Sequence, residues 1–127
     1  MGNDILNIFG KLGARGEKLV RKSLEGSGYS VLETNYRTPF GEIDIIAHND
    51  NYIAFIEVKT RRNTQFSHPC EAITYNKRQH IRHAVQYYLS QYPSEKQPRF
   101  DVAEVLDDGE NIKINIIENA FSGSEDE

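Results

Sequence analysis

Charged residues stand in two short runs of the sequence that otherwise look like buried β-strands. Glu57 and Lys59 fall near the end of Tyr52–Thr60 (YIAFIEVKT), and Asp44 falls in the preceding run, Glu42–His48 (EIDIIAH). Buried carboxylates are costly unless they are paired or bind a metal ion. Mg²⁺ takes one or two carboxylates together with water and substrate phosphate. The pattern therefore indicates phosphodiester hydrolysis, with Asp44 and Glu57 holding the metal and Lys59 orienting water or stabilising charge on the phosphate.

Strand alternation decides which of these side chains can meet. Within residues 52–60, Glu57 and Lys59 point to the same face. Both faces are apolar in the first half of this run, which is typical of a central strand covered on both sides. A hairpin turn at residues 48–51 would place Asp44 roughly opposite Glu57 or Lys59. A cross-strand ion pair on a solvated sheet edge would give the same pattern.

Two helical residues are candidates to join the site. Residues 13–27 predict a first helix, and Glu17 borders its apolar stripe, where it could serve as a further metal ligand. Thr74 is expected to cap a second helix running to Gln91. Lys77 begins the inward stripe of that helix near its N-terminus, an end that favours phosphate. For both residues, a boundary position with the charge in water is the alternative.

The remaining runs complete an α/β domain. Residues 29–36, 99–106 and 112–117 are rich in β-branched and aromatic residues and predict three more strands. The order α-β-β-β-α-β-β predicts a mixed five-stranded β-sheet flanked by helices. We expect a single domain over residues 11–118 and an acidic, disordered tail over residues 119–127.

Charge is distributed unevenly along the chain. The net charge of −4 argues against a protein that coats nucleic acid non-specifically. Residues 59–83 nevertheless hold six basic residues against Glu71 alone, whereas residues 101–127 hold nine acids against Lys113. A solvated surface of uneven charge is one explanation; the other is a patch that faces phosphates. On the second explanation, the residues expected to hold a nucleic-acid backbone are Arg61, Arg62, Lys77, Arg78 and Arg82.

Composition excludes several classes of protein. Cys70 is the single cysteine, so no internal disulfide can form, and this fits a reducing cytoplasm. No run approaches the roughly 20 apolar residues that span a bilayer, and the N-terminus lacks the pattern of a secretory signal. We therefore expect a cytoplasmic protein with no membrane partner. A homodimer would double the surface available for nucleic acid.

Other charged and metal-binding residue types have simpler explanations. Asp101 could be a further acid of the site or a partner for Arg99, and we favour the pairing. The four histidines have no zinc-like spacing with one another or with the cysteine, so surface or loop positions are expected for them.

Several short motifs occur in a fixed order and cover most of the predicted domain. They are Gly16-Glu17, Asn35-Tyr-Arg37, residues 41–47 (GEIDIIA), residues 55–61 (FIEVKTR), Lys77 and residues 99–102 (RFDV). Together they resemble the YraN-like family of small bacterial and archaeal proteins. That family is similar to the restriction-endonuclease-like superfamily, which includes archaeal Holliday-junction resolvases.

The resemblance implies a fold and a set of roles. The superfamily pattern, PD-(D/E)xK, is a helical Glu, then an Asp on one strand, then ExK on the next. By position these are Glu17, Asp44, and Glu57 with Lys59 two residues later. The resemblance implies a restriction-endonuclease-like fold, Mg²⁺ or Mn²⁺ held by the acids, and a catalytic role for Lys59. Ile43 stands where the superfamily often has Pro.

Three hypotheses follow. The first is a metal-dependent endonuclease acting on DNA, with branched or damaged structures as candidate substrates. The second is a nucleic-acid-binding or complex-forming module that keeps the nuclease fold without turnover. The third is a structural protein stabilised by its ion pairs. Metal-dependent cleavage separates the first two, and the effect of removing Glu57 on stability tests the third.

Overall fold

The computed structural model describes residues 15–62 and 74–121 of the 127-residue chain. The predicted order α-β-β-β-α-β-β is confirmed. Predicted strand boundaries lie within two residues of those in the structure. The elements are a first helix at residues 15–26, β1 (Ser30–Thr38), β2 (Gly41–His48), β3 (Tyr52–Arg61), α3 (Tyr75–Gln91), β4 (Gln97–Asp107) and β5 (Ile112–Ile117).

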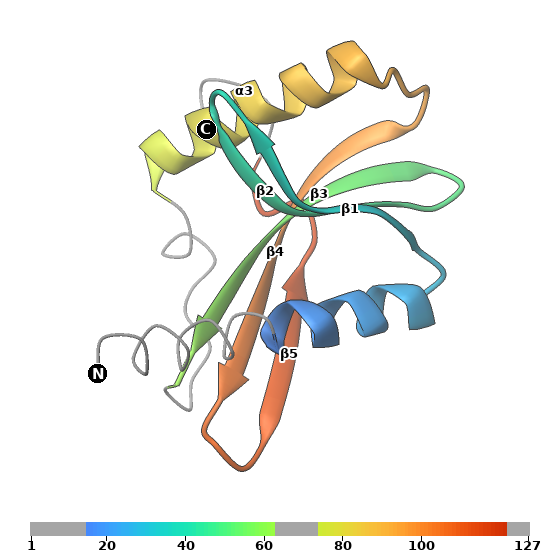
Figure 1. Ribbon diagram of the computed structural model, residues 1–127. Helices are drawn as coiled ribbons and strands as arrows, with labels where there is room; N and C mark the ends of the chain where they lie inside the picture. The colour runs from blue at the N-terminus through green and yellow to red at the C-terminus, as the bar shows by residue number, and fades with distance from the viewer. Residues whose placement is uncertain (1–14, 63–73, 122–127) are drawn as a thin grey trace.

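The strands form one mixed sheet in the order β1-β2-β3-β4-β5. β3 and β4 run parallel, and the other neighbouring pairs are antiparallel. Parallel neighbours need a crossover connection, and α3 lies within the segment that joins β3 to β4. The sheet is strongly twisted, so that the β1–β2 hairpin turns toward α3 while β3, β4 and β5 extend past the first helix (Figure 1).

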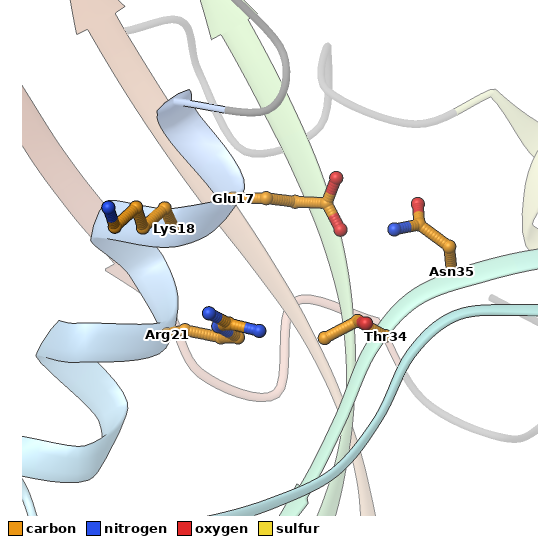
Figure 2. Close-up of a pocket in the computed structure, with 5 residues that line it drawn as sticks. All are labelled: Glu17, Lys18, Arg21, Thr34 and Asn35. Atoms are coloured by element: carbon orange, nitrogen blue, oxygen red, sulfur yellow. The ribbon is translucent and has the colours of Figure 1, made fainter.

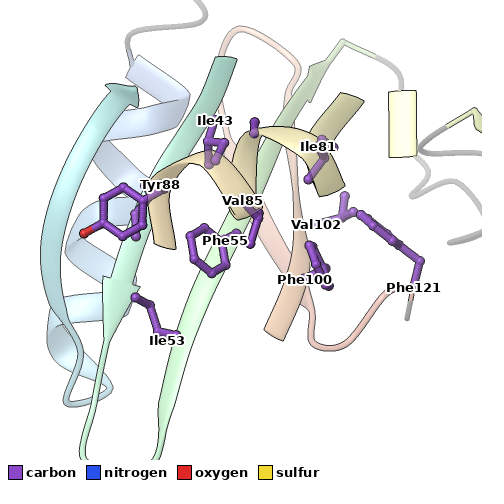
Figure 3. Close-up of a cluster of buried hydrophobic side chains, with 11 residues drawn as sticks. Ile43, Ile53, Phe55, Ile81, Val85, Tyr88, Phe100, Val102 and Phe121 are labelled. Atoms are coloured by element: carbon purple, nitrogen blue, oxygen red, sulfur yellow. The ribbon is translucent and has the colours of Figure 1, made fainter. Parts of the chain in front are cut away.

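Two hydrophobic cores lie on opposite faces of the sheet. The core beneath α3 includes Phe55, Val85 and Tyr88 (Figure 3). The core beneath the first helix includes Val20 and Ile56. Because adjacent residues Phe55 and Ile56 belong to different cores, β3 is covered on both sides, as its two apolar faces predicted.

Local signals set the ends of both helices. The hydroxyl of Thr74 accepts a hydrogen bond from the backbone N–H of Lys77 at 3.2 Å, which confirms the predicted N-cap of α3. The first helix ends where Gly28 adopts φ +92°, a left-handed conformation that glycine tolerates. The backbone N–H of Tyr29 then donates back to the carbonyl of Leu24 at 3.0 Å.

The predicted pairing of Arg99 with Asp101 is confirmed. The Arg99 guanidinium donates to both carboxylate oxygens of Asp101 at 2.9 to 3.1 Å, and both residues are buried. Asp101 also accepts from the backbone N–H of Asn119 at 2.9 Å. This ion pair therefore ties β4 to the segment that follows β5.

Residues 119–121, which were predicted to begin the disordered tail, pack against the domain. Phe121 is buried and stacks on Phe100 with ring centroids 5.0 Å apart, and the N–H of Ala120 donates to the Phe100 carbonyl at 2.8 Å. Residues 119–121 therefore belong to the folded domain, because an apolar ring in otherwise acidic sequence finds a place in the core. Predictions for residues 63–73, with Cys70 and His68, and for residues 122–127 lie outside the described residues. No helix in the described part of the chain has the length and apolar character needed to cross a bilayer.

Candidate active site

The site lies where β2 and β3 part. These strands pair through four residue pairs, and the last of them joins Ile45 to Ile56. Beyond that point β2 remains paired only with β1, while β3 continues beside β4 as far as Arg61. Asp44 and Glu57 are the first residues past the last pair, one on each strand. The predicted meeting of these two acids is therefore confirmed.

Asp44 is anchored to the neighbouring strand by its side chain. Its Oδ2 accepts a hydrogen bond from the backbone N–H of Val58 at 2.8 Å. That N–H has lost its strand partner because β2 has turned away, and the carboxylate takes the place of the missing carbonyl. Satisfying a half-buried N–H in this way holds Asp44 against β3.

Glu57 is the most deeply placed carboxylate of the site, with only 8% of the residue exposed. Its Oε1 lies 3.8 Å from the Lys59 Nζ and 3.5 Å from the Lys77 Nζ. The side chains of Lys59 and Lys77 are 37% and 41% exposed, so both amines remain accessible from the surface. β3 and the first turn of α3 thus bring two positive charges to one buried acid, as predicted for Lys77.

The surroundings of Glu57 make its ionisation costly. Burial raises the pKa of the Glu57 carboxyl from 4.5 to about 7, and the negative charge of Asp44 adds to the rise. The charges of Lys77 and Lys59 lower the pKa but do not cancel the first two effects. A carboxyl in this state exchanges its proton near neutral pH, and a divalent cation would favour its charged form.

Gly16 sets the position of the first helix over the sheet. A Cβ atom at this residue would lie 2.7 Å from the Thr60 Oγ1 and 3.5 Å from a methyl group of Val105. Only glycine allows the helix backbone to come this close to β3 and β4. The next residue, Glu17, is consequently held near the point where β2 and β3 part.

Glu17 brings a third carboxylate from the first helix. Burial and the nearby charge of Asp44 raise the pKa of the Glu17 carboxyl, and a hydrogen bond from the Asn35 side chain lowers it. Glu17 Oε1 is buried without a hydrogen-bond partner among the described residues. Figure 2 shows Glu17 and Asn35 pointing toward one another. They line an open pocket of about 280 Å³ together with Lys18, Arg21 and Thr34.

Asn35 also belongs to the site. It forms part of the Asn35-Tyr-Arg37 motif, but the sequence predicted no role for it. Its backbone φ is +51°, a left-handed conformation that is uncommon in a strand and that Asn tolerates better than most residues. Its neighbours Thr34 and Tyr36 pair with the residues on either side of Asp44. An Asn within a run of β-branched and aromatic residues is the signal that could have identified it.

The three acids do not form a ready cage for a metal ion. Within residues 15–62 and 74–121, no cluster of three or more acidic, histidine or cysteine side chains is close enough to hold one. Asp44 is turned toward a backbone N–H, and Glu57 toward two lysines. Carboxylates repel one another, and here Asp44 and Glu57 each have a different partner.

The predicted backbone-binding residues fall into two groups. Arg61 ends β3 and is half-buried, and Arg62, the last described residue before the gap, is exposed. Both follow Lys59 on the strand that carries Glu57. Arg61 lies on the same face of β3 as Lys59, two residues away, so it extends the positive charge of the site toward the end of the strand.

Arg78 and Arg82 lie further along α3. Arg78 is half-buried, with its guanidinium 5.8 Å from the centre of the Tyr75 ring. Arg82 is only 5% exposed, and its guanidinium lies 5.9 Å from the centre of the Phe121 ring. In this arrangement Arg82 does not reach the surface, so its expected contact with a nucleic-acid backbone stays a prediction that the geometry does not favour.

Comparison with known proteins places the chain in a family. The model of the uncharacterised protein family UPF0102 matches residues 16–105, a span that includes every acid and lysine of the site. The chain is 46% identical over 111 residues to a UPF0102 protein of Alkaliphilus metalliredigens, covering 87% of this chain and 96% of that relative. A UPF0102 protein of Thermodesulfovibrio yellowstonii has the same identity and coverage. A third relative, from Clostridium acetobutylicum, is 42% identical over 114 residues, covering 87% and 93% of the two chains. The chain therefore belongs to the UPF0102 family.

Proposed function

We propose that this protein is a metal-dependent nuclease of the restriction-endonuclease-like type, which hydrolyses phosphodiester bonds in DNA. One observation carries the proposal: Asp44 and Glu57 meet where β2 and β3 part, and the amines of Lys59 and Lys77 converge on Glu57. The helical acid Glu17 completes the order of residues that defines the superfamily pattern.

The residues present suit a hard divalent cation such as Mg²⁺ or Mn²⁺. The candidate ligands are carboxylates, the donor type that these ions prefer. Glu17 Oε1 is buried without a hydrogen-bond partner among the described residues, which is costly unless a cation or water reaches it. Asp44, Glu57 and Glu17 would hold the ion. Once bound, it would polarise the phosphate and lower the pKa of an attacking water.

Side chains of the protein would orient the metal ligand and bind the phosphates. Asp44 is oriented by the Val58 N–H and so presents its other oxygen in a fixed direction. With Glu57 holding a cation, the Lys59 and Lys77 amines would be free to meet the phosphate. Lys59 is placed to stabilise negative charge as the phosphodiester is attacked. Lys77, at the N-terminus of α3, is placed to hold a neighbouring phosphate.

A second function is supported by the same ion pairs. Two lysine amines lie within 4 Å of Glu57, so this acid has positive partners without a metal ion. A module that binds nucleic acid or a protein partner without turnover would need no more than this. A homodimer of either kind remains a prediction.

Metal-dependent cleavage distinguishes the two functions. The protein is incubated with duplex, single-stranded and four-way-junction DNA, in Mn²⁺, in Mg²⁺ or in chelator. The nuclease predicts cleavage that requires metal and that is lost in Asp44→Asn and in Lys59→Ala. Lys113→Ala removes an exposed charge on β5 and serves as the matched control, because it should leave cleavage unchanged. DNA binding without cleavage under every metal condition would refute the nuclease and support the module.

A further inference from the structure

Helix α3 has a charge pattern unlike the rest of the chain. Its 17 residues, YNKRQHIRHAVQYYLSQ, contain three Lys or Arg and two His but no Asp or Glu. The whole chain, in contrast, has 19 acidic residues against 15 basic ones. Although Arg82 is buried, the helix carries no acid and begins at the candidate site with Lys77 and Arg78, so its first turn is complementary to a polyanion.

An aromatic ring projects beside this helix from the tip of the β1–β2 hairpin. Phe40 is 47% exposed, and its ring centre lies 5.5 Å from that of His83 and 6.4 Å from that of Tyr87. The hairpin tip lies along α3 (Figure 1), and a Cβ at Gly41 would be 3.7 Å from the His80 Cβ. The helix thus supports one side of the Phe40 ring and leaves about half of the residue exposed.

The hairpin turn holds Phe40 in this position. The Thr38 hydroxyl accepts a hydrogen bond from the Phe40 N–H at 3.0 Å and donates to the Gly41 carbonyl at 2.8 Å. Gly41 has φ +142°, a conformation that side-chain-bearing residues rarely adopt. An exposed aromatic residue whose backbone is fixed in this way loses little conformational entropy when a ligand covers it.

The distance to the candidate site matches a few nucleotides. His83 is six residues beyond Lys77 on α3, which corresponds to about 9 Å along the helix axis. Phe40 is four residues before Asp44, which corresponds to about 14 Å along an extended chain. Stacked bases are about 3.4 Å apart, so these distances span roughly three or four base steps.

We propose that Phe40, supported by His83 and Tyr87, is a stacking surface for unpaired bases next to the phosphate that is cleaved. The inference rests on the proposed function and names its substrate class: DNA with a single-stranded segment beside the cleavage site. The bases of an intact duplex are covered by their neighbours, whereas an unpaired base offers a free face to an aromatic ring. Phe40 carries no hydrogen-bonding group in its side chain, so the contact would not select a base sequence.

Binding measured without metal tests the surface separately from catalysis. Fluorescence anisotropy in chelator compares a labelled blunt duplex with the same duplex carrying a single-stranded overhang. We expect the wild type to prefer the overhang and Phe40→Ala to bind it about tenfold more weakly, with blunt-duplex binding unchanged. Phe40→Trp should retain the preference. Leu32→Ala, which removes another exposed apolar side chain on β1, is the matched control and should also retain it.

Three results would overturn the inference. In the first, Phe40→Ala melts like the wild type and binds both DNAs as the wild type does. In the second, sedimentation shows that Phe40→Ala dissociates a dimer, which would make this surface an interface between two copies of the chain. Asp44→Asn separates the two proposals, because it should abolish cleavage but keep the preference for the overhang. In the third, cleavage is affected neither by the overhang nor by Phe40→Ala, which would refute the stacking surface but not the nuclease.

Discussion

Replacing Glu57 by Gln should stabilise the protein at alkaline pH. Burial and the charge of Asp44 raise the pKa of the Glu57 carboxyl to about 7, although Lys59 and Lys77 are close enough to pair with it. The ionised form is therefore less stable in the fold than in the unfolded chain. Gln has nearly the same shape, remains neutral, and can still accept a hydrogen bond from either lysine.

The sign follows from the direction of the pKa change. A carboxyl whose pKa is higher in the folded state contributes its stability below its unfolded value, and that contribution is lost as pH rises through the folded value. For Glu57 the loss occurs between about pH 4.5 and pH 7. A pKa raised from 4.5 to about 7 corresponds to about 3 kcal/mol when the group is fully ionised. Relaxation around the charged form would reduce this, so a gain of about 2–3 kcal/mol is expected at pH 8.

Urea denaturation at two pH values measures this difference. In metal-free buffer, Glu57→Gln should have a higher free energy of unfolding than the wild type at pH 8, and a difference below about 1 kcal/mol at pH 5. Glu110→Gln alters an exposed acid in the turn between β4 and β5 and should show no such dependence on pH. A Glu57→Gln variant less stable than the wild type at pH 8 would refute the reasoning, because the lysine pairs would then outweigh burial and repulsion.

Metal adds a second measurement to the same experiment. If Glu57 is a ligand, Mg²⁺ or Mn²⁺ stabilises the folded wild type according to its concentration relative to the dissociation constant. The wild type should then approach the stability of Glu57→Gln at pH 8, and the variant should respond little. Equal stabilisation of both proteins by the metal would exclude Glu57 as a ligand.

Two further substitutions test the parts that hold the site in place. Gly16→Ala puts a methyl group 2.7 Å from the Thr60 Oγ1, so the first helix should shift and carry Glu17 with it. Mn²⁺ affinity by isothermal titration should fall, Gly16→Ala with Thr60→Ala should regain part of it, and unchanged affinity in the single variant would contradict this role. Asp101→Asn leaves the buried Arg99 guanidinium without its bidentate partner, and urea denaturation should show a loss of about 3 kcal/mol or more. A loss below about 1 kcal/mol would mean that the Arg99–Asp101 pair contributes little to the fold.

Sequence periodicity predicted most of the scaffold, because each element had a clear local signal. The apolar faces of β3, the Thr74 cap of α3 and the pairing of Arg99 with Asp101 all depend on residues close in sequence or on simple alternation. The meeting of Asp44 with Glu57 followed from the same reasoning applied to one hairpin.

The features that escaped prediction depend on three-dimensional packing. Alternation along β2 and β3 does not show where the two strands separate, because that depends on how far the hairpin twists toward α3. Arg82 and Phe121 are both buried and lie beside each other, although they are far apart in the chain. The left-handed conformation of Asn35, which has no Cα partner on β2, is likewise not signalled by strand alternation.

Because β2 and β3 separate next to the acids, a rotation of the β1–β2 hairpin about the last β2–β3 pair would move its tip much more than it moves Asp44. Asp44 is one residue from the last β2–β3 pair, whereas Gly41 is four residues from it. Each strand residue adds roughly 3.4 Å to the distance from that pair. A trial rotation of about 10° around the pair would therefore move the hairpin tip by about 2 Å and Asp44 by about 0.6 Å. Under the proposed function, a tip movement of this size would fit nucleic acids of different shape while the spacing of the carboxylates stayed nearly constant.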